Sequence, residues 1–64
     1  MNQKNTLIRF FARLGDGSEH PFEVDALSLR KGDVIAHAFA VDWQERGHIP
    51  PGDILSVRRA RFDE

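Results

Sequence analysis

Apolar and polar residues alternate in three stretches of this sequence, at 6–14, 20–26 and 54–62. A two-residue period places successive side chains on opposite faces of an extended chain, so each stretch predicts a β-strand. The first stretch is the clearest, and one of its faces carries only Ile8, Phe10, Ala12 and Leu14. We expect this apolar face to pack against a helix and the opposite face to stay open.

The residues between the first two strands are Gly15-Asp16-Gly17-Ser18. Asp-Gly between two strands predicts a tight hairpin, because the turn needs residues that tolerate positive φ. The alternative, a phosphate-binding loop at Gly15-x-Gly17, lacks the Lys-Ser/Thr signature and a following helix start. In the second strand, Pro21 has no N–H to donate, which predicts an edge strand.

Residues 33–47 predict the only helix. At about 100° per residue, Ile35 and Phe39 lie at the centre of a broad apolar arc. An alternative is a third strand over 34–41, where alanines also alternate. The alanine content and the helix-forming residues at 43–47 favour the helix.

The two ends of the predicted helix differ in clarity. At its start, Ser28 and Asp33 are both residues that can cap a helix, and the sequence leaves the choice between them open. At its end, Gly47 fits the left-handed position that commonly follows a last turn. Two prolines, Pro50 and Pro51, prevent the helix from resuming, and we expect Ile49 between them and Gly47 to be tucked under the domain.

These elements predict an α+β fold: a three-stranded antiparallel sheet with one helix packed on one face, in the order β-β-α-β. The 64 residues form one domain, 1–64, and contain no cysteine. The absence of disulfides favours a reducing cytoplasm. The chain has no apolar run as long as a membrane span and no signal-peptide pattern at its start, so we expect a protein that makes no membrane contact.

The search for catalytic, metal and cofactor chemistry finds no candidates. The histidines are 17 and 11 residues apart, at His20, His37 and His48, and have no ligand spacing typical of a metal site. No serine lies in a nucleophile elbow. Glu23 and Asp25 are on an open sheet, where no pocket would raise a carboxyl pKa for catalysis. We therefore expect no catalytic residues, no metal, no cofactor and no enzymatic activity.

The charge of the chain argues for an interface. The formal net charge is −1, which disfavours a protein that holds nucleic acid by net charge alone. Seven of the nine basic residues are arginine, which favours planar, bidentate contacts. The predicted partner-binding residues are Arg9, Phe11, Arg13 and Arg58, joined at the end of the last strand by Arg59 and Arg61.

Four interpretations of that surface remain open. It is a protein-binding face, or a solvated face laced with ion pairs in which Glu23 and Asp25 lie opposite or diagonal to Arg9 and Arg13. It binds single-stranded or duplex nucleic acid, with Phe11 stacking on bases and arginines holding phosphates. Alternatively, the exposed strand edges join two copies in a homodimer.

The segment Glu23-Val24-Asp25-Ala26-Leu27-Ser28, followed by Ile35-Ala36 in the helix, resembles the strand-to-helix joint of small phage-encoded proteins. With its E-x-[DE]-x-L-S pattern, size and β-β-α-β order, the chain is similar to anti-CRISPR inhibitors of type I surveillance complexes. The resemblance implies a non-enzymatic inhibitor that occupies a surface of a host protein or nucleoprotein complex. The balanced charge differs from that of the acidic, DNA-mimicking inhibitors.

Overall fold

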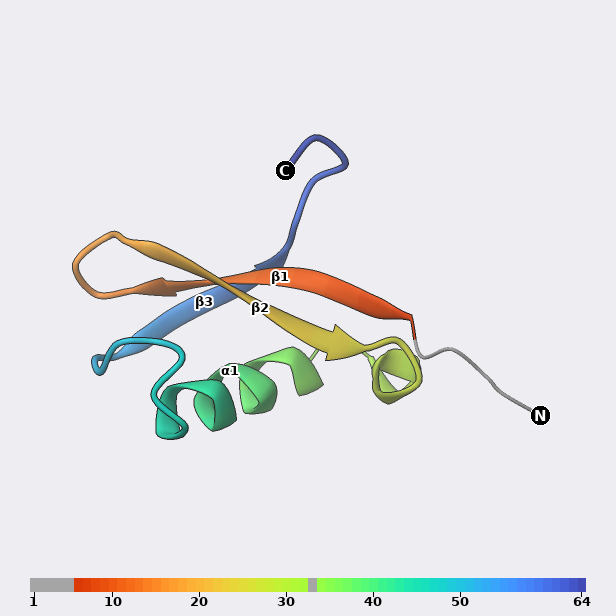
Figure 1. The fold of residues 1–64 in the computed structure, drawn as a ribbon, viewed down its shortest axis with the longest axis horizontal. Coiled ribbons are helices and arrows are strands. Elements are labelled where there is room, and N and C mark those ends of the chain that lie inside the picture. The colour runs from red at the N-terminus through yellow and green to blue at the C-terminus, as the bar shows by residue number, and fades with distance from the viewer. Residues whose placement is uncertain (1–5, 33) are drawn as a thin grey trace.

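The computed structural model describes residues 6–32 and 34–64. Its strands and α-helix form two layers, with the helix α1 lying across one face of a three-stranded antiparallel sheet (Figure 1). The elements in chain order are β1 (Leu7–Leu14), β2 (Glu19–Asp25), the 3-10 helix η1 (Ser28–Lys31), α1 (Ile35–Glu45) and β3 (Ile54–Arg59). This arrangement confirms the predicted α+β fold.

The longest strand, β1, is central in the sheet, whose order is β2-β1-β3. β1 and β2 form a hairpin in which Leu14 N–H donates to Ser18 O at 2.9 Å. Gly17 has a φ of 89° in the turn, a conformation that glycine adopts without strain. The Asp16 carboxylate accepts hydrogen bonds from the Ser18 N–H and hydroxyl. The predicted Asp-Gly hairpin turn is thus confirmed, and Gly15 and Gly17 are both part of it.

The core lies between the sheet and α1. Its buried residues are Phe10, Ala12, Leu14, Phe22, Val24, Ala36, Ala40 and Ile49. The helix turns two of its three alanines, Ala36 and Ala40, directly to the sheet, and both are fully buried. Ile35 and Phe39 are only partly buried on the flank, so the prediction that they centre the apolar arc is wrong by about a quarter-turn. Small side chains at i and i+4 let the helix approach the sheet closely.

The C-terminal end of α1 has two hydrogen bonds that close the last turn. Gly47 N–H donates to Gln44 O, and His48 N–H donates to Trp43 O at 2.9 Å. These are the two bonds of a Schellman motif, which requires Gly47 at its φ of 88°. The turn leads the chain directly into the core, where Ile49 is 1% exposed. Both predictions for this segment are confirmed.

The start of α1 departs from the prediction that Ser28 caps it. Ser28 lies in η1, which precedes α1 as a separate short turn, so α1 is not the only helix. The residue before α1 is Val34, whose side chain makes no capping hydrogen bond. Asp33, the second predicted cap, lies outside the described residues. The alternative strand over 34–41 is wrong.

The last strand is shorter than predicted and irregular. β3 ends at Arg59, and its pairing with β1 shifts between Arg13 and Leu14. Ile54 pairs with Leu14 and Ser56 pairs with Arg13, so Leu55 is the extra residue of a bulge and its exposure is 63%. None of the helices in the described part of the chain has the length and apolar character that crossing a membrane requires.

Candidate partner-binding surface

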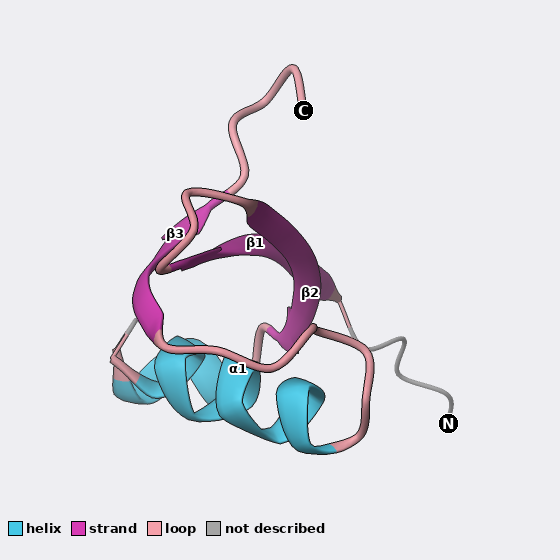
Figure 2. Cartoon of the chain, turned by 90° about the vertical axis from the view of Figure 1, so that its left-hand side faces the viewer, coloured by secondary structure: helices cyan, strands magenta, loops and turns pink. Residues whose placement is uncertain are grey.

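The sheet face that α1 leaves uncovered is here called the open face. Its side chains come from the residues that alternate with the core positions: Leu7, Arg9, Phe11 and Arg13 of β1, Glu19, Pro21, Glu23 and Asp25 of β2, and Ser56 and Arg58 of β3. The C-terminal segment 60–64 rises from the sheet on the side away from α1 (Figure 2). The side chains of the open face therefore come from all three strands, and the segment 60–64 lies beside them.

Arg58 is the best-connected side chain of the open face. Its guanidinium donates to both carboxylate oxygens of Glu19, at 3.2 and 3.0 Å, and to both of Glu64, at 2.8 and 2.9 Å. A fifth bond reaches the Arg59 carbonyl at 3.4 Å. A guanidinium has five N–H groups, so its donors are fully used. The Arg58 Cζ atom also lies 4.9 Å from the centre of the Phe11 ring, a cation–π contact.

The hydrogen bonds from Arg58 change the ionisation of its partners. They lower the pKa of Glu64 to about 2, with help from the Arg61 N–H, which donates to the same carboxylate at 2.6 Å. They also lower the pKa of Glu19 below its usual range, and the two carboxylates raise the pKa of Arg58. All three groups are therefore charged at neutral pH, and this cluster ties the C-terminal segment to β2 and β3.

The other arginines of the open face are held less tightly. Arg9 pairs with Glu23 in the sheet register, at a nitrogen–oxygen distance of 3.9 Å. Arg13 is directly opposite Glu19. Asp25 is opposite Leu7 and therefore diagonal to Arg9, and one of its carboxylate oxygens accepts the Leu27 N–H at 3.0 Å. Both acids thus have the predicted position, opposite or diagonal to Arg9, and Glu23 forms an ion pair with it.

Two of the six predicted site residues lie apart from the open face. Arg59 pairs with Phe10 across the sheet, and its Cζ atom is 5.7 Å from the Phe10 ring, so its side chain is on the face that α1 covers. Arg61 is beyond β3, in a turn where its carbonyl accepts the Glu64 N–H at 3.0 Å. The structure brings together Arg9, Phe11, Arg13 and Arg58, and separates Arg59 and Arg61 from them.

The sequence patterns do not indicate Glu19 and Glu64 as site residues. Glu19 precedes the predicted second strand at 20–26, although the alternation of Glu19, Pro21 and Glu23 continues through it. Glu64 has no such signal, because its position depends on how the chain turns after β3 ends. Both carboxylates belong to the cluster around Arg58.

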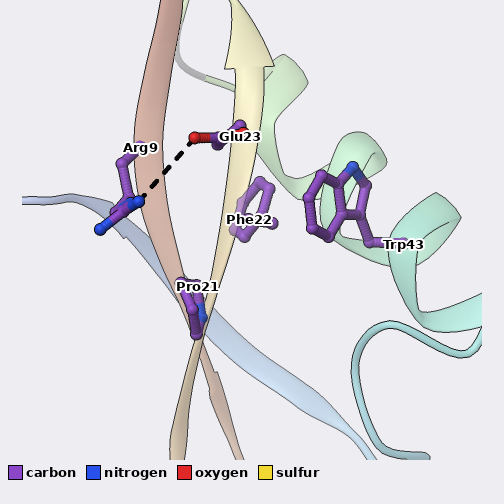
Figure 3. Close-up of a pocket in the computed structure, with 5 residues that line it drawn as sticks. All are labelled: Arg9, Pro21, Phe22, Glu23 and Trp43. Atoms are coloured by element: carbon purple, nitrogen blue, oxygen red, sulfur yellow. Dashed lines mark ion pairs between the residues drawn. The ribbon is translucent and has the colours of Figure 1, made fainter.

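A hollow lies at the outer edge of β2, where the open face meets α1. This edge hollow has a volume of about 210 Å³ and is lined by Arg9, Pro21, Phe22, Glu23 and Trp43 (Figure 3). The Trp43 ring reaches it from α1 and is 6.3 Å from the Phe22 ring, centre to centre. The hollow thus combines the partly exposed Trp43 ring with the ion pair of Arg9 and Glu23, above the buried Phe22.

The described residues contain no group of three or more side chains suited to hold a metal ion. His20 contacts the Ser18 hydroxyl at 2.9 Å, and His48 packs against Trp43 at 5.3 Å between ring centres. Comparisons of the chain with protein-family models, with curated proteins and with solved structures find no match. The functional argument therefore rests on the surface itself.

Proposed function

We propose that this chain is a non-enzymatic binding protein that contacts a host protein or nucleoprotein complex through its open face, at Arg9, Phe11, Arg13 and Arg58. The observation that carries the proposal is the Arg58 cluster. Two carboxylates and the Phe11 ring hold the guanidinium in one position. A surface ordered before binding loses little side-chain entropy when a partner docks, and arginine and aromatic residues are enriched at interfaces.

The pairing of charges favours a protein partner over nucleic acid. A phosphate would have to displace Glu19 and Glu64 from Arg58, because the five N–H groups of Arg58 are already engaged. Glu23 and Asp25 add negative charge to the same face, and Phe11 is the single aromatic side chain among the open-face residues defined above. A mixed-charge surface instead suits the mixed charges of a protein surface.

The ionisation of the carboxylates supports a function without catalysis. A general acid needs a pKa raised towards neutrality, whereas Arg58 lowers the pKa of both Glu19 and Glu64. These groups stay ionised and hydrogen-bonded, which suits a structural role in a contact surface.

The resemblance at 23–28 gives the proposal a narrower form: a phage-derived inhibitor of the anti-CRISPR type that blocks a surface of a type I surveillance complex. In the fold, 23–28 runs from the end of β2 into η1. Its first residue, Glu23, belongs to the open face, so an inhibitor of this type would use one continuous surface.

The test is co-elution of the chain with a purified type I surveillance complex on a sizing column. Arg13→Glu should abolish co-elution, because it reverses a charge of the open face on the central strand. Arg46→Glu is the matched control, since Arg46 is at the end of α1 and pairs with Asp42. If the wild type does not co-elute, the anti-CRISPR form of the proposal is wrong.

The broader proposal has its own test in capture from host lysate with the same two variants. Equal recovery of captured proteins by Arg13→Glu and Arg46→Glu would contradict the open face as the contact surface. A mobility shift with single-stranded and duplex nucleic acid distinguishes the alternative function. Binding that falls steeply with salt would indicate a nucleic-acid-binding domain instead.

A further inference from the structure

In the described part of the chain, β2 is an edge strand, and no other strand pairs with the main-chain groups on its outer side. Ala26 N–H donates to Thr6 O at 2.8 Å, and Leu14 N–H donates to Ser18 O, which fixes the phase of the β1–β2 ladder. Hydrogen-bonded and non-hydrogen-bonded pairs alternate in an antiparallel ladder. With this phase and register, the N–H and C=O groups of Glu23 and Asp25 point away from β1. β2 is at the edge of the sheet, so they face outwards.

Pro21 limits how a strand could add to this edge. It occupies another outward-facing position, where it offers a carbonyl but no N–H. A long added strand would have one carbonyl group opposite Pro21 that receives no hydrogen bond. The edge therefore suits a short extended segment that pairs mainly with the stretch from Glu23 to Asp25.

The side chains along the edge are acidic. β2 contains no lysine or arginine. Both carboxylate oxygens of Glu19 accept hydrogen bonds from Arg58. A carboxylate oxygen of Glu23, by contrast, is 3.9 Å from a guanidinium nitrogen of Arg9, which is longer than a charge-assisted hydrogen bond. Asp25 uses one oxygen for the Leu27 N–H. Two carboxylates with remaining acceptor capacity thus lie two residues apart on the same face.

We propose that the free edge of β2 binds an extended segment of a partner protein in which two basic residues flank an apolar one. The two basic side chains would lie over Glu23 and Asp25. The segment's opposite face would turn apolar side chains towards α1, against Trp43 in the edge hollow (Figure 3). This inference names a partner chemistry for the proposed binding function and rests on it.

A second copy of the chain fits this edge poorly. Antiparallel pairing of two β2 edges would bring the acidic side chains of one copy close to those of the other. Like charges opposite one another destabilise a sheet. Strand addition with alternating specificity is a known mode of peptide recognition, and here the alternation is cation, apolar, cation.

The test uses a short synthetic peptide that alternates lysine with valine, and the fluorescence of the chain as its readout. Trp43 is the only tryptophan and the chain has no tyrosine, so emission reports directly on the edge hollow. We expect a saturable change in emission with added peptide. Raising salt from about 0.01 M to about 1 M, which shortens the Debye length from about 30 to about 3 Å, should weaken binding.

Two control peptides separate strand addition from charge attraction. The first carries N-methyl groups on the amides that would face β2, and should bind about tenfold more weakly because its hydrogen bonds are lost. The second alternates glutamate with valine and should not bind. Equal binding of the methylated and unmethylated peptides, or no binding of the lysine peptide, would overturn the proposal.

A pair of charge-matched variants locates the site. Glu23→Lys should weaken binding of the lysine peptide about fivefold, an effect sized from exposed ion pairs. Glu45→Lys, on an exposed position of α1, should leave binding unchanged. Equal effects of the two substitutions on peptide binding would overturn the assignment. It would also be overturned if the emission changed with the concentration of the chain itself and sedimentation gave the mass of a dimer. Arg13→Glu should still bind peptide, which distinguishes failure of this edge from failure of the open face.

Discussion

Different forces hold the side chains in place on the two faces of the sheet. The face under α1 is apolar, and the rings of Phe10 and Phe22 stack there at 5.6 Å, in a core that also contains Ala36, Ala40 and the loop residue Ile49. The open face has no such cover. Its most ordered feature is Arg58, held by Glu19, Glu64 and the Phe11 ring.

This difference separates stability from recognition. Burial of apolar area depends little on pH or salt and contributes most of the folding free energy. Ion pairs on an exposed face contribute little to stability, but their geometry and charge can be read by a partner. We therefore expect substitutions under α1 to unfold the chain and substitutions on the open face to change binding with the fold intact.

The largest expected difference between the two faces appears when one phenylalanine on each face is truncated to alanine. Phe22→Ala should lower the free energy of unfolding by about 3–5 kcal/mol, because it leaves a cavity in the core. Phe11→Ala should lower it by about 1 kcal/mol, the scale of an exposed cation–π contact. Urea unfolding followed by circular dichroism measures both. Similar losses for the two variants would show that the open face is also part of the stabilising core.

A smaller effect is expected at the turn that leads from α1 into the core. Gly47→Ala should cost about 1–2 kcal/mol, since an alanine at a φ of 88° is strained even though no atom lies within 4 Å of an added Cβ. Gly15→Ala is the control, because Gly15 also has open space and is not at positive φ. Thermal unfolding that shifts equally for both would contradict a special backbone requirement at Gly47.

Much of the fold could be predicted because local chemistry agrees with the tertiary structure. The alternation in β1, the Asp16-Gly17 turn and Gly47 each act over a few residues, and all three are found. The orientation of α1 was missed because apolar size indicated Ile35 and Phe39, whereas close packing placed Ala36 and Ala40 against the sheet. The apolar periodicity predicts that an amphipathic helix exists more reliably than it predicts which side of that helix faces the sheet.

The candidate surface was predictable only in part. Alternation along the strands placed Arg9, Phe11, Arg13 and Arg58 on one face, and the register of the structure sets Arg58 opposite Phe11. The bulge at Leu55 and the early end of β3 are set by pairing across the sheet and by the chain turning at 60–64. No local pattern reports these, so the carboxylates that neutralise Arg58 were found only in the structure.

The smallest expected effect concerns the segment 60–64 and its dependence on pH. The folded structure lowers the pKa of Glu64 from an ordinary 4.5 to about 2, through hydrogen bonds from Arg58 and the Arg61 N–H. A carboxylate with a lowered pKa stabilises the docked segment fully above pH 4.5 and loses this contribution as the pH falls through about 2. The segment should therefore detach in acid between these values, while the core remains folded.

The amide resonance of Arg61 measures this detachment, because its N–H donates to Glu64 at 2.6 Å. It should titrate with a midpoint near pH 2, and Glu64→Gln should shift it at neutral pH towards its acid position. Asp63→Asn removes a neighbouring charge and serves as the control, with the Arg61 midpoint unchanged. A midpoint near pH 4.5 in the wild type would mean that Arg58 does not hold Glu64. The open face would then have Glu19 as the remaining carboxylate partner of Arg58, leaving this arginine more accessible to an anionic partner than proposed above.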